Sequence, residues 1–326
     1  MNKLVLCIII LCISISSYPQ PFKDTINEAN VRRIITILAS DSLKGRGNHT
    51  TSLHKAADFI ANEFAATKLQ FHPAFKSYFQ PFITTKVDAA NVTDSSGGYN
   101  PKHVLLNVIA VLPGKSLPNE AIIFSAHYDH LGMQESEGEN IFNGANDNAS
   151  GTTALLVLAN YYALRNDNER TLVFCAFAGE ELGLYGSAAF LKYILPDQVK
   201  AMINIEMIGR KNIAGKNAFI ITGAQFSNLE NIIRKNLKRT KIRVYSERDH
   251  RKMLFQRSDN YLFAREGIPA HTIMSSDDDD ECYHQPCDEV ERIDIQNMTE
   301  IIKAIAIACR TLINGRDTPS RISAKL

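Results

Sequence analysis

Short apolar runs alternate with amphipathic segments along most of the chain from residue 107 onward. The runs are five or six residues long and rich in Ile, Val and Phe, which is typical of buried strands. They are Asn107–Leu112, Ala121–Ala126, Thr171–Ala176, Ala201–Ile205, Ala218–Thr222 and Ala270–Met274. Helical spacing of apolar residues predicts helices near 150–163, 184–194, 227–237 and 258–266, and a last helix over about 297–313. The pattern predicts an α/β fold of three layers, in which helices flank both faces of a mixed, largely parallel β-sheet.

The first third of the chain has a different pattern. Apolar residues recur at helical spacing over Val31–Leu38 and Ala56–Leu69, so we expect helices within 25–70. Residues 71–100 are rich in Pro, Gly, Ser and polar residues, and we expect strand and loop there. The sequence contains no internal repeat and no long low-complexity segment. We therefore expect a single domain over residues 20–326.

The N-terminus carries the pattern of a secretory signal peptide. Lys3 precedes an unbroken apolar run over Leu4–Ile13, and small and polar residues follow over Ser14–Gln20. A run of ten apolar residues is too short to span a bilayer, which argues against the alternative of an uncleaved anchor. We predict a signal peptide over residues 1–19 and a secreted or periplasmic protein with no stable membrane association once the signal is removed.

Composition narrows the classes of partner. The 326 residues include 36 basic and 35 acidic side chains, a net charge of +1, so nothing in the charge favours nucleic acid or an anionic membrane surface. We expect peptide substrates and a monomer. Cys282 and Cys287 lie on either side of His284 and could form a small disulfide loop in an oxidising compartment or remain two separate thiols.

Histidines and carboxylates follow the predicted strands where each strand ends. Asp147 is the exception, because it lies in an Asn- and Gly-rich stretch just before the helix near 150. In such a sheet, ligands bind beyond the carboxyl ends of the strands, so we expect these side chains to share one site. The residues are His127, Asp129, Asp147, Glu180, Glu181, Glu206 and His284.

This set of donors indicates a metal centre. Carboxylates that share a cleft repel one another, and a divalent cation removes that cost. Imidazole nitrogen and carboxylate oxygen suit Zn²⁺ especially well. Five such ligands exceed what one tetrahedral zinc needs, and Asp147 could bridge two ions in an arrangement known from hydrolases.

The ordered motifs of the chain resemble those of the M28 zinc peptidases, whose members include secreted bacterial aminopeptidases. The resemblance covers nearly the whole chain after the predicted signal, and its motifs are specific in combination. The matching segments are 125–132, 143–151, 178–187, 204–209 and 283–286, with weaker support from 40–47 and 257–260.

The resemblance implies a ligand set for two zinc ions. Asp147 would bridge the ions. His127 and Glu206 would complete one metal site, and Glu181 and His284 would complete the other. The family usually has Asp where this chain has Glu206, a side chain longer by one methylene group. We expect Glu206 to remain a ligand.

The resemblance also implies three catalytic or supporting roles. Glu180 would be the general base, which takes a proton from water and later delivers it to the leaving amine. Asp129 would fix the ring of His127 through the nitrogen that does not face metal. Tyr283 occupies the position where some members place a hydroxyl against the developing oxyanion.

The implied activity is that of a zinc-dependent exopeptidase, an aminopeptidase that removes N-terminal residues from peptides. Three alternatives remain. One is a glutaminyl cyclase-like aminoacyltransferase with a single zinc, although that group usually has Trp in its pocket and this chain has none. A carboxypeptidase or dipeptidase on the same fold is the second. A binding module without catalysis is the third.

Other polar residues near these motifs are expected to have structural roles. We expect Asp288 to cap the next helix with Glu291 as its capping-box partner. We expect His130 and His271 to support the fold rather than to bind metal. The acidic run Asp277–Asp280 is expected to lie in a solvated loop.

Overall fold

The computed structural model describes residues 25–84, 92–93, 98–134, 140–211, 215–247 and 252–323. The predicted signal peptide lies outside these residues. Across the described ranges, no helix has both the length and the apolar character needed to cross a membrane.

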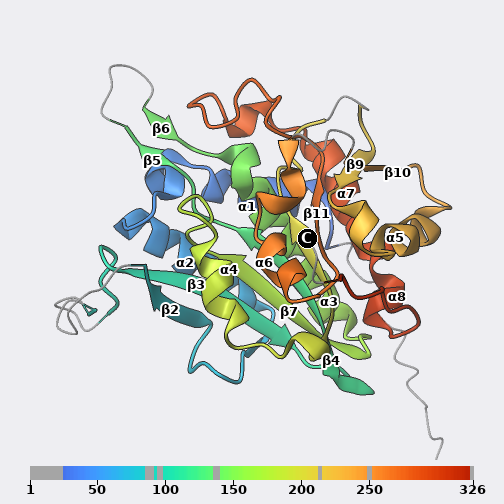
Figure 1. Ribbon diagram of the computed structural model, residues 1–326. Coiled ribbons are helices and arrows are strands. Elements are labelled where there is room, and N and C mark those ends of the chain that lie inside the picture. Colours follow the sequence, from blue (N-terminus) through green and yellow to red (C-terminus); the bar gives the residue numbers. More distant parts are fainter. Residues whose placement is uncertain are drawn as a thin grey trace, which may run out of the picture.

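A nine-stranded mixed sheet forms the centre of the molecule (Figure 1). The strand order is β1-β3-β7-β4-β8-β11-β9-β10, and β2 pairs with β3. The strands are β1 (Gln70–Phe71), β2 (Phe79–Ile83), β3 (Val104–Leu112), β4 (Leu117–His127), β7 (Arg170–Phe177), β8 (Val199–Ile205), β9 (Ala218–Ile221), β10 (Arg243–Ser246) and β11 (Ala270–Met274). A small separate sheet pairs β5 (Gly132–Met133) with β6 (Ile141–Phe142).

The four central strands of the large sheet run parallel. β4 pairs in parallel with β7 on one side and with β8 on the other, and β8 pairs in parallel with β11. Antiparallel pairings join β3 to β7 and β9 to β11. The carboxyl ends of β7, β4, β8 and β11 therefore meet at one edge of the sheet, as the sequence predicts.

Helices cover both faces of the sheet. One face carries α1 (Glu28–Leu38), α2 (Thr51–Ala66), α3 (Gly151–Arg165), α5 (Leu229–Leu237), α7 (Ile295–Ala308) and α8 (Arg310–Ile313). The other face carries α4 (Tyr185–Leu191) and α6 (Asn260–Arg265), which lie in front of the sheet in Figure 1. The predicted three-layer α/β fold is confirmed.

Alternation along β3 shows how the two cores are built. Val108 and Ala110 pack into the larger core, whereas Ile109 and Val111 pack into the smaller one. Successive side chains of a strand point to opposite faces, so a strand covered on both sides must be apolar at nearly every position. This is why the central strands are unbroken apolar runs in the sequence.

Each of the six predicted strands is present in the structure, as β3, β4, β7, β8, β9 and β11. One strand that the apolar pattern does not predict is β10 (Arg243–Ser246), in which only Val244 is buried. This strand lies at the edge of the sheet, where a short segment needs few apolar residues to pair. The predicted helices are confirmed in α3 to α7, with ends shifted by a few residues.

Candidate active site

The candidate site lies at the carboxyl edge of the four parallel strands. His127 is the last residue of β4, and Glu180 and Glu181 follow β7 in a turn. Glu206 directly follows β8. Asp147 lies in the short helical turn Ala145–Ser150 that leads into α3. His284 belongs to the segment after β11, so five separate parts of the chain converge here.

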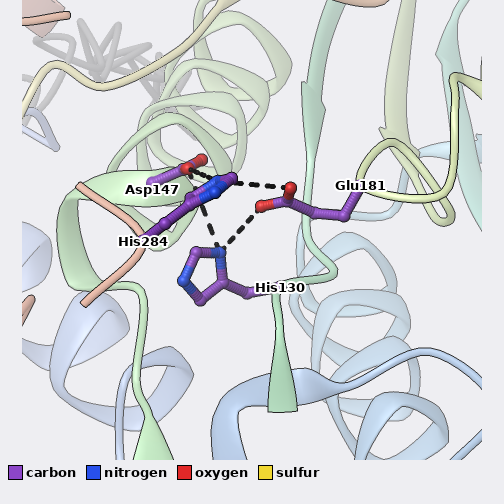
Figure 2. A group of neighbouring side chains, drawn as sticks. All are labelled: His130, Asp147, Glu181 and His284. Atoms are coloured by element: carbon purple, nitrogen blue, oxygen red, sulfur yellow. Dashed lines mark hydrogen bonds and ion pairs between the residues drawn. The ribbon is translucent and has the colours of Figure 1, made fainter. Parts of the chain in front are cut away.

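Asp147 lies between the two histidines predicted to bind metal. Its Oδ1 is 3.3 Å from His127 Nε2, and its Oδ2 is 3.1 Å from His284 Nε2. The same nitrogen of His284 is 3.3 Å from Glu181 Oε2. Figure 2 shows Asp147, Glu181 and His284 pointing toward one another.

Two groups of potential ligands share Asp147. One group is His127, Asp147 and Glu206, whose nearest ligand atoms all lie within 4.8 Å of one another. The other group is His130, Asp147, Glu181 and His284, gathered within the same limit. Two neighbouring sets of donors thus have one carboxylate in common.

Unpartnered atoms in the site argue that these groups hold a cation. Neither His127 Nε2 nor Asp147 Oδ1 has a hydrogen bond, although the two residues are only 1% and 3% exposed. Buried polar atoms are rarely left without a partner, because losing water without replacement costs free energy. A metal ion would satisfy both atoms, and nitrogen and oxygen donors in this number fit zinc.

The sequence predicts a structural role for His130, but its side chain lies within this site. Its Nδ1 lies 2.9 Å from Glu181 Oε1 and 4.0 Å from Asp147 Oδ2 (Figure 2). Its Nε2 is buried without a hydrogen-bond partner. His271, in contrast, is held by Thr222 O and Ser227 Oγ at 2.8 and 2.7 Å, as expected of a structural histidine.

Glu180 faces a cavity of about 280 Å³ that also reaches Asp147 and Glu206. Burial raises the pKa of Glu180 well above its ordinary value, and the nearby Glu206 raises it further. A carboxylate with a raised pKa holds a proton more strongly. Glu180 in this environment therefore holds a proton more strongly than an exposed glutamate does.

Glu206 points into the same site despite its longer side chain. Burial raises the pKa of Glu206 to about 7, while the charge of His127 lowers it and that of Asp147 raises it. The hydroxyl of Ser258 donates a hydrogen bond to Glu206 Oε2. The carboxylate is therefore held in place by Ser258.

Asp129 is fully buried and holds the turn that carries the two adjacent glutamates. Its carboxylate accepts the backbone N–H groups of Glu180 and Glu181, each at 3.2 Å, and the amide of Asn48 at 2.7 Å. His127 Nδ1 lies 3.2 Å from the backbone oxygen of Asp129 and 3.8 Å from its carboxylate. Asp129 thus supports both His127 and the glutamate turn.

Tyr283 lines the cavity and stacks on His284, with ring centroids 3.9 Å apart and planes tilted by 18°. Arg257 Nη2 donates to its hydroxyl at 3.3 Å. Burial raises the pKa of Tyr283, so the phenol keeps its proton at neutral pH. A disulfide joins Cys282 to Cys287, so these residues are not two separate thiols. The loop that it closes contains both Tyr283 and His284.

Asp288 has a different role from the one that the sequence predicts. Its carboxylate accepts the backbone N–H groups of Asn146 and Asp147 at 3.0 Å. The side chain that caps the next long helix, α7, is Asp294. The capping-box prediction was wrong because Asp288 is buried against a loop 142 residues earlier in the chain, a contact with no local sequence pattern.

The acidic run Asp277–Asp280 is paired rather than simply solvated. Lys252 Nζ lies within 3.2 Å of the carboxylates of Asp277, Asp278 and Asp279. Arg210 pairs with Asp280. The run is thereby tied to basic side chains beside the cavity.

Known proteins share this sequence and this fold. The family model of Peptidase family M28 matches residues 107–308. A curated relative from Trichophyton verrucosum, named "Probable leucine aminopeptidase", is 27% identical over 87% of this chain and 82% of its own length. A relative from Pyrenophora teres f. teres, named "Probable zinc metalloprotease", is 28% identical over 56% of this chain. The match spans only 36% of that relative's length, and 43% of the length of a similar protein from Leptosphaeria maculans.

Solved structures show the same fold at low sequence identity. A zinc aminopeptidase from Bacillus subtilis, BSAP, aligns with a TM-score of 0.70 at 16% identity and covers 89% of this chain and 95% of its own. LapB from Legionella pneumophila aligns at 0.68 and 20%, over 91% of this chain and 77% of its own. A glutaminyl cyclase from Bacteroides thetaiotaomicron aligns at 0.62 and 15%, over 87% and 97%. The fold alone does not separate these activities, but the matched region at 107–308 is well over half of the 326 residues, and the chain belongs to peptidase family M28.

Proposed function

We propose that the protein is a zinc-dependent aminopeptidase that removes N-terminal residues from peptides and uses two zinc ions. The observation that carries this proposal is the position of Asp147, whose two oxygens face His127 and His284 from opposite sides at 3.3 and 3.1 Å. The names of the Trichophyton and Bacillus proteins support the same activity.

The two donor groups would each hold one ion. His127, Asp147 and Glu206 would bind the first, and Asp147, Glu181 and His284 the second. When bound, zinc polarises the carbonyl of the scissile peptide bond and lowers the pKa of water to about 7. The ring of His130, hydrogen-bonded to Glu181, would orient that carboxylate.

Glu180 would move the proton. It accepts a proton from the attacking water and then donates it to the nitrogen of the leaving amine. Its neighbour Glu181 points toward His130 and His284, so one carboxylate would transfer the proton and the other would bind metal. A tight turn makes this division feasible, since the N–H groups of Gly183 and Leu184 both donate to Glu180 O, at 2.8 and 3.0 Å.

The cavity and Tyr283 would complete the site. The protonated hydroxyl of Tyr283 is a donor for the oxygen of the carbonyl under attack. The volume of about 280 Å³ lies just below the range of ligand pockets, which span roughly 300–1,000 Å³, so the site is small.

Export and domain organisation are part of the proposal. The pattern of residues 1–19 supports a cleaved signal peptide, a single domain over 20–326 and a secreted or periplasmic location. N-terminal sequencing of the protein recovered from a secreting host tests this part. A mature chain that begins between residues 18 and 21 supports it, and a chain that still begins at Met1 contradicts it.

Chelation tests the activity. Removal of metal should abolish hydrolysis of leucine p-nitroanilide, and added zinc should restore it, with full activity at two equivalents. The matched substrate N-acetyl-leucine p-nitroanilide, which has no free amino group, should not be cleaved. Activity that survives chelation would contradict the metal mechanism. Ammonia release from a peptide with N-terminal Gln, without cleavage of its backbone, would favour the cyclase.

A further inference from the structure

The segment Asp41–Asn48 lies against the site although it is about 80 to 100 residues away from the neighbouring loops in sequence. Gly47 forms a parallel bridge with His130, whose N–H donates to Arg46 O at 3.2 Å. Gly45 has a φ of +63°, and a Cβ there would lie 2.4 Å from the carbonyl oxygens of both Gly132 and Phe142. The segment is therefore fitted closely between the loop after β4 and the loop before α3.

Arg46 is the centre of this contact. It is fully buried, and its guanidinium donates four hydrogen bonds to backbone carbonyls. Nε donates to Tyr128 O at 2.7 Å, Nη1 to Leu38 O at 2.6 Å and to Asn143 O at 2.7 Å, and Nη2 to Gly144 O at 3.0 Å.

Two of the carbonyls that accept these hydrogen bonds lie close in sequence to proposed zinc ligands. Tyr128 stands between His127 and Asp129, so its carbonyl fixes the backbone that presents both side chains. Gly144 begins the turn that carries Asp147. One planar group thus joins the two loops whose spacing sets the distance between His127 and Asp147.

The charge of Arg46 acts on the same site. Its four hydrogen bonds go to neutral carbonyls, so no carboxylate within the described structure is hydrogen-bonded to the guanidinium. Burial lowers the pKa of Arg46 to about 10, and the charges of Asp288, Asp129, Asp147 and Glu181 raise it. The group is cationic at neutral pH and offsets part of the repulsion among these carboxylates.

We propose that Arg46 is a positioning residue of the zinc site, which holds the His127 and Asp147 loops at the spacing that zinc requires and partly balances their charge. This inference rests on the proposed function, because it assumes that zinc is the bound ion. The proposed mechanism assigns this segment no other role.

Arg170 offers a matched control within the same fold. It is 3% exposed and donates to Leu312 O at 2.7 Å and Asp317 O at 2.9 Å, and it pairs with Glu120. It begins β7, whereas Glu180 and Glu181 follow the other end of that strand. Replacing either arginine removes buried hydrogen bonds, but only Arg46 contacts the site loops.

The experiment compares Arg46→Lys with Arg170→Lys. Lysine keeps the charge but cannot reach four carbonyls in the plane of a guanidinium. Zinc dissociation constants are measured by competition with a metal indicator, and thermal melting of the metal-free proteins is measured in parallel. We expect Arg46→Lys to weaken zinc binding at least tenfold, and Arg170→Lys to lower the melting temperature with zinc affinity within twofold of the native value.

Zinc-dependent melting keeps the test decisive if Arg46→Lys is unfolded without metal. The inference then requires that Arg46→Lys refold at high zinc, with a midpoint at least ten times that of Arg170→Lys. Native-like affinity in Arg46→Lys, an equal loss in Arg170→Lys, or failure of Arg46→Lys to fold at saturating zinc would overturn it. If the native protein binds no zinc, the proposed function fails instead, which is a separate result.

Discussion

Two neighbouring regions of the sheet differ in whether their buried polar side chains are fully hydrogen-bonded. In the body of the sheet, Asn204 of β8 has every amide atom engaged. Its Oδ1 accepts from Ser125 Oγ at 2.7 Å, and its Nδ2 donates to Ser258 Oγ at 2.7 Å and to Thr272 Oγ1 at 3.0 Å. Two residues further along the chain, Glu206 begins the edge where His127 Nε2, His130 Nε2 and Asp147 Oδ1 are buried without a hydrogen bond.

This comparison distinguishes a structural polar network from a binding site. A satisfied network stabilises the fold and needs nothing from outside, whereas unpartnered buried atoms that converge from separate loops require a ligand. Both regions are polar and both are buried, so neither property alone identifies the site. The gathering of such atoms from His127, His130 and Asp147 identifies it, since single buried atoms without a hydrogen bond also occur elsewhere, for example at Thr153 and Asn168.

Histidines of the two regions show the same contrast. Burial lowers the pKa of His271, in the body of the sheet, to about 4, although the carbonyl of Thr222 raises it. For His284, at the edge, burial also lowers the pKa, but hydrogen bonds to Asp147 and Glu181 outweigh it and raise the pKa to about 10. At the edge, carboxylates stabilise the protonated form of His284, whereas in the body of the sheet burial favours the neutral form of His271.

The largest expected effect is on kcat, and it distinguishes Glu180 from the adjacent Glu181 at the edge of the sheet. Glu180→Gln should lower kcat by roughly 10²–10⁴, the usual contribution of a general base, and leave the zinc content unchanged. Glu181→Gln is the matched variant and should weaken zinc binding, since Glu181 lies in the donor group. Steady-state kinetics and metal analysis of both variants check this. Full activity of Glu180→Gln, or loss of zinc from it, would break the assignment.

Tyr283→Phe should have the next largest effect. The variant keeps the ring that stacks on His284 but removes the hydroxyl, so zinc binding should be unchanged. If the hydroxyl stabilises the oxyanion, kcat should fall by roughly 10²–10³ with little change in KM. The kcat and KM of the zinc-loaded variant decide the point, and a native kcat would leave Tyr283 as a packing residue only.

A change in the body of the sheet should affect stability more than metal binding, although Ser258 Oγ links the Asn204 amide to Glu206. Asn204→Ala leaves its buried hydroxyl partners without an amide, which should lower the free energy of unfolding by about 1–3 kcal/mol. Urea unfolding of the metal-free protein measures this loss. Zinc stoichiometry should stay at the native value, and a variant that unfolds normally but binds no zinc would show that the two regions are not separate.

The last expected effect is a dependence of stability on pH. Because the pKa of His271 is lower in the folded protein than its ordinary value of 6.5, the unfolded chain binds the proton first as pH falls. The contribution of His271 to stability should therefore fall between about pH 6.5 and pH 4, by at most about 1.4 kcal/mol for each pH unit. His271→Asn should flatten that part of the profile in urea unfolding. A slope equal to that of the native protein would contradict the assignment.

Local patterns in the sequence predict much of this molecule, and the reason is physical. Strands such as β4 and β8 are buried on both faces, so their apolar runs are visible without any knowledge of the fold. The ligands follow because parallel strands bring their carboxyl ends together.

The residues that hold those ligands were not predictable in this way. Arg46 contacts Asn143, and Asp288 contacts Asn146, across 97 and 142 residues of sequence. Neither arginine in a glycine-rich turn nor aspartate after a disulfide loop carries a local pattern of such a role. Only the tertiary structure brings these residues to the loops that they hold.

Asp147 is proposed to join two zinc ions at the edge of the sheet. Anomalous scattering at the zinc absorption edge, recorded from crystals of the zinc-loaded protein, tests it most directly. The account predicts two peaks, one among His127, Asp147 and Glu206 and one among Asp147, Glu181 and His284. Peaks that avoid Asp147, or zinc found only on the outer surface, would contradict it.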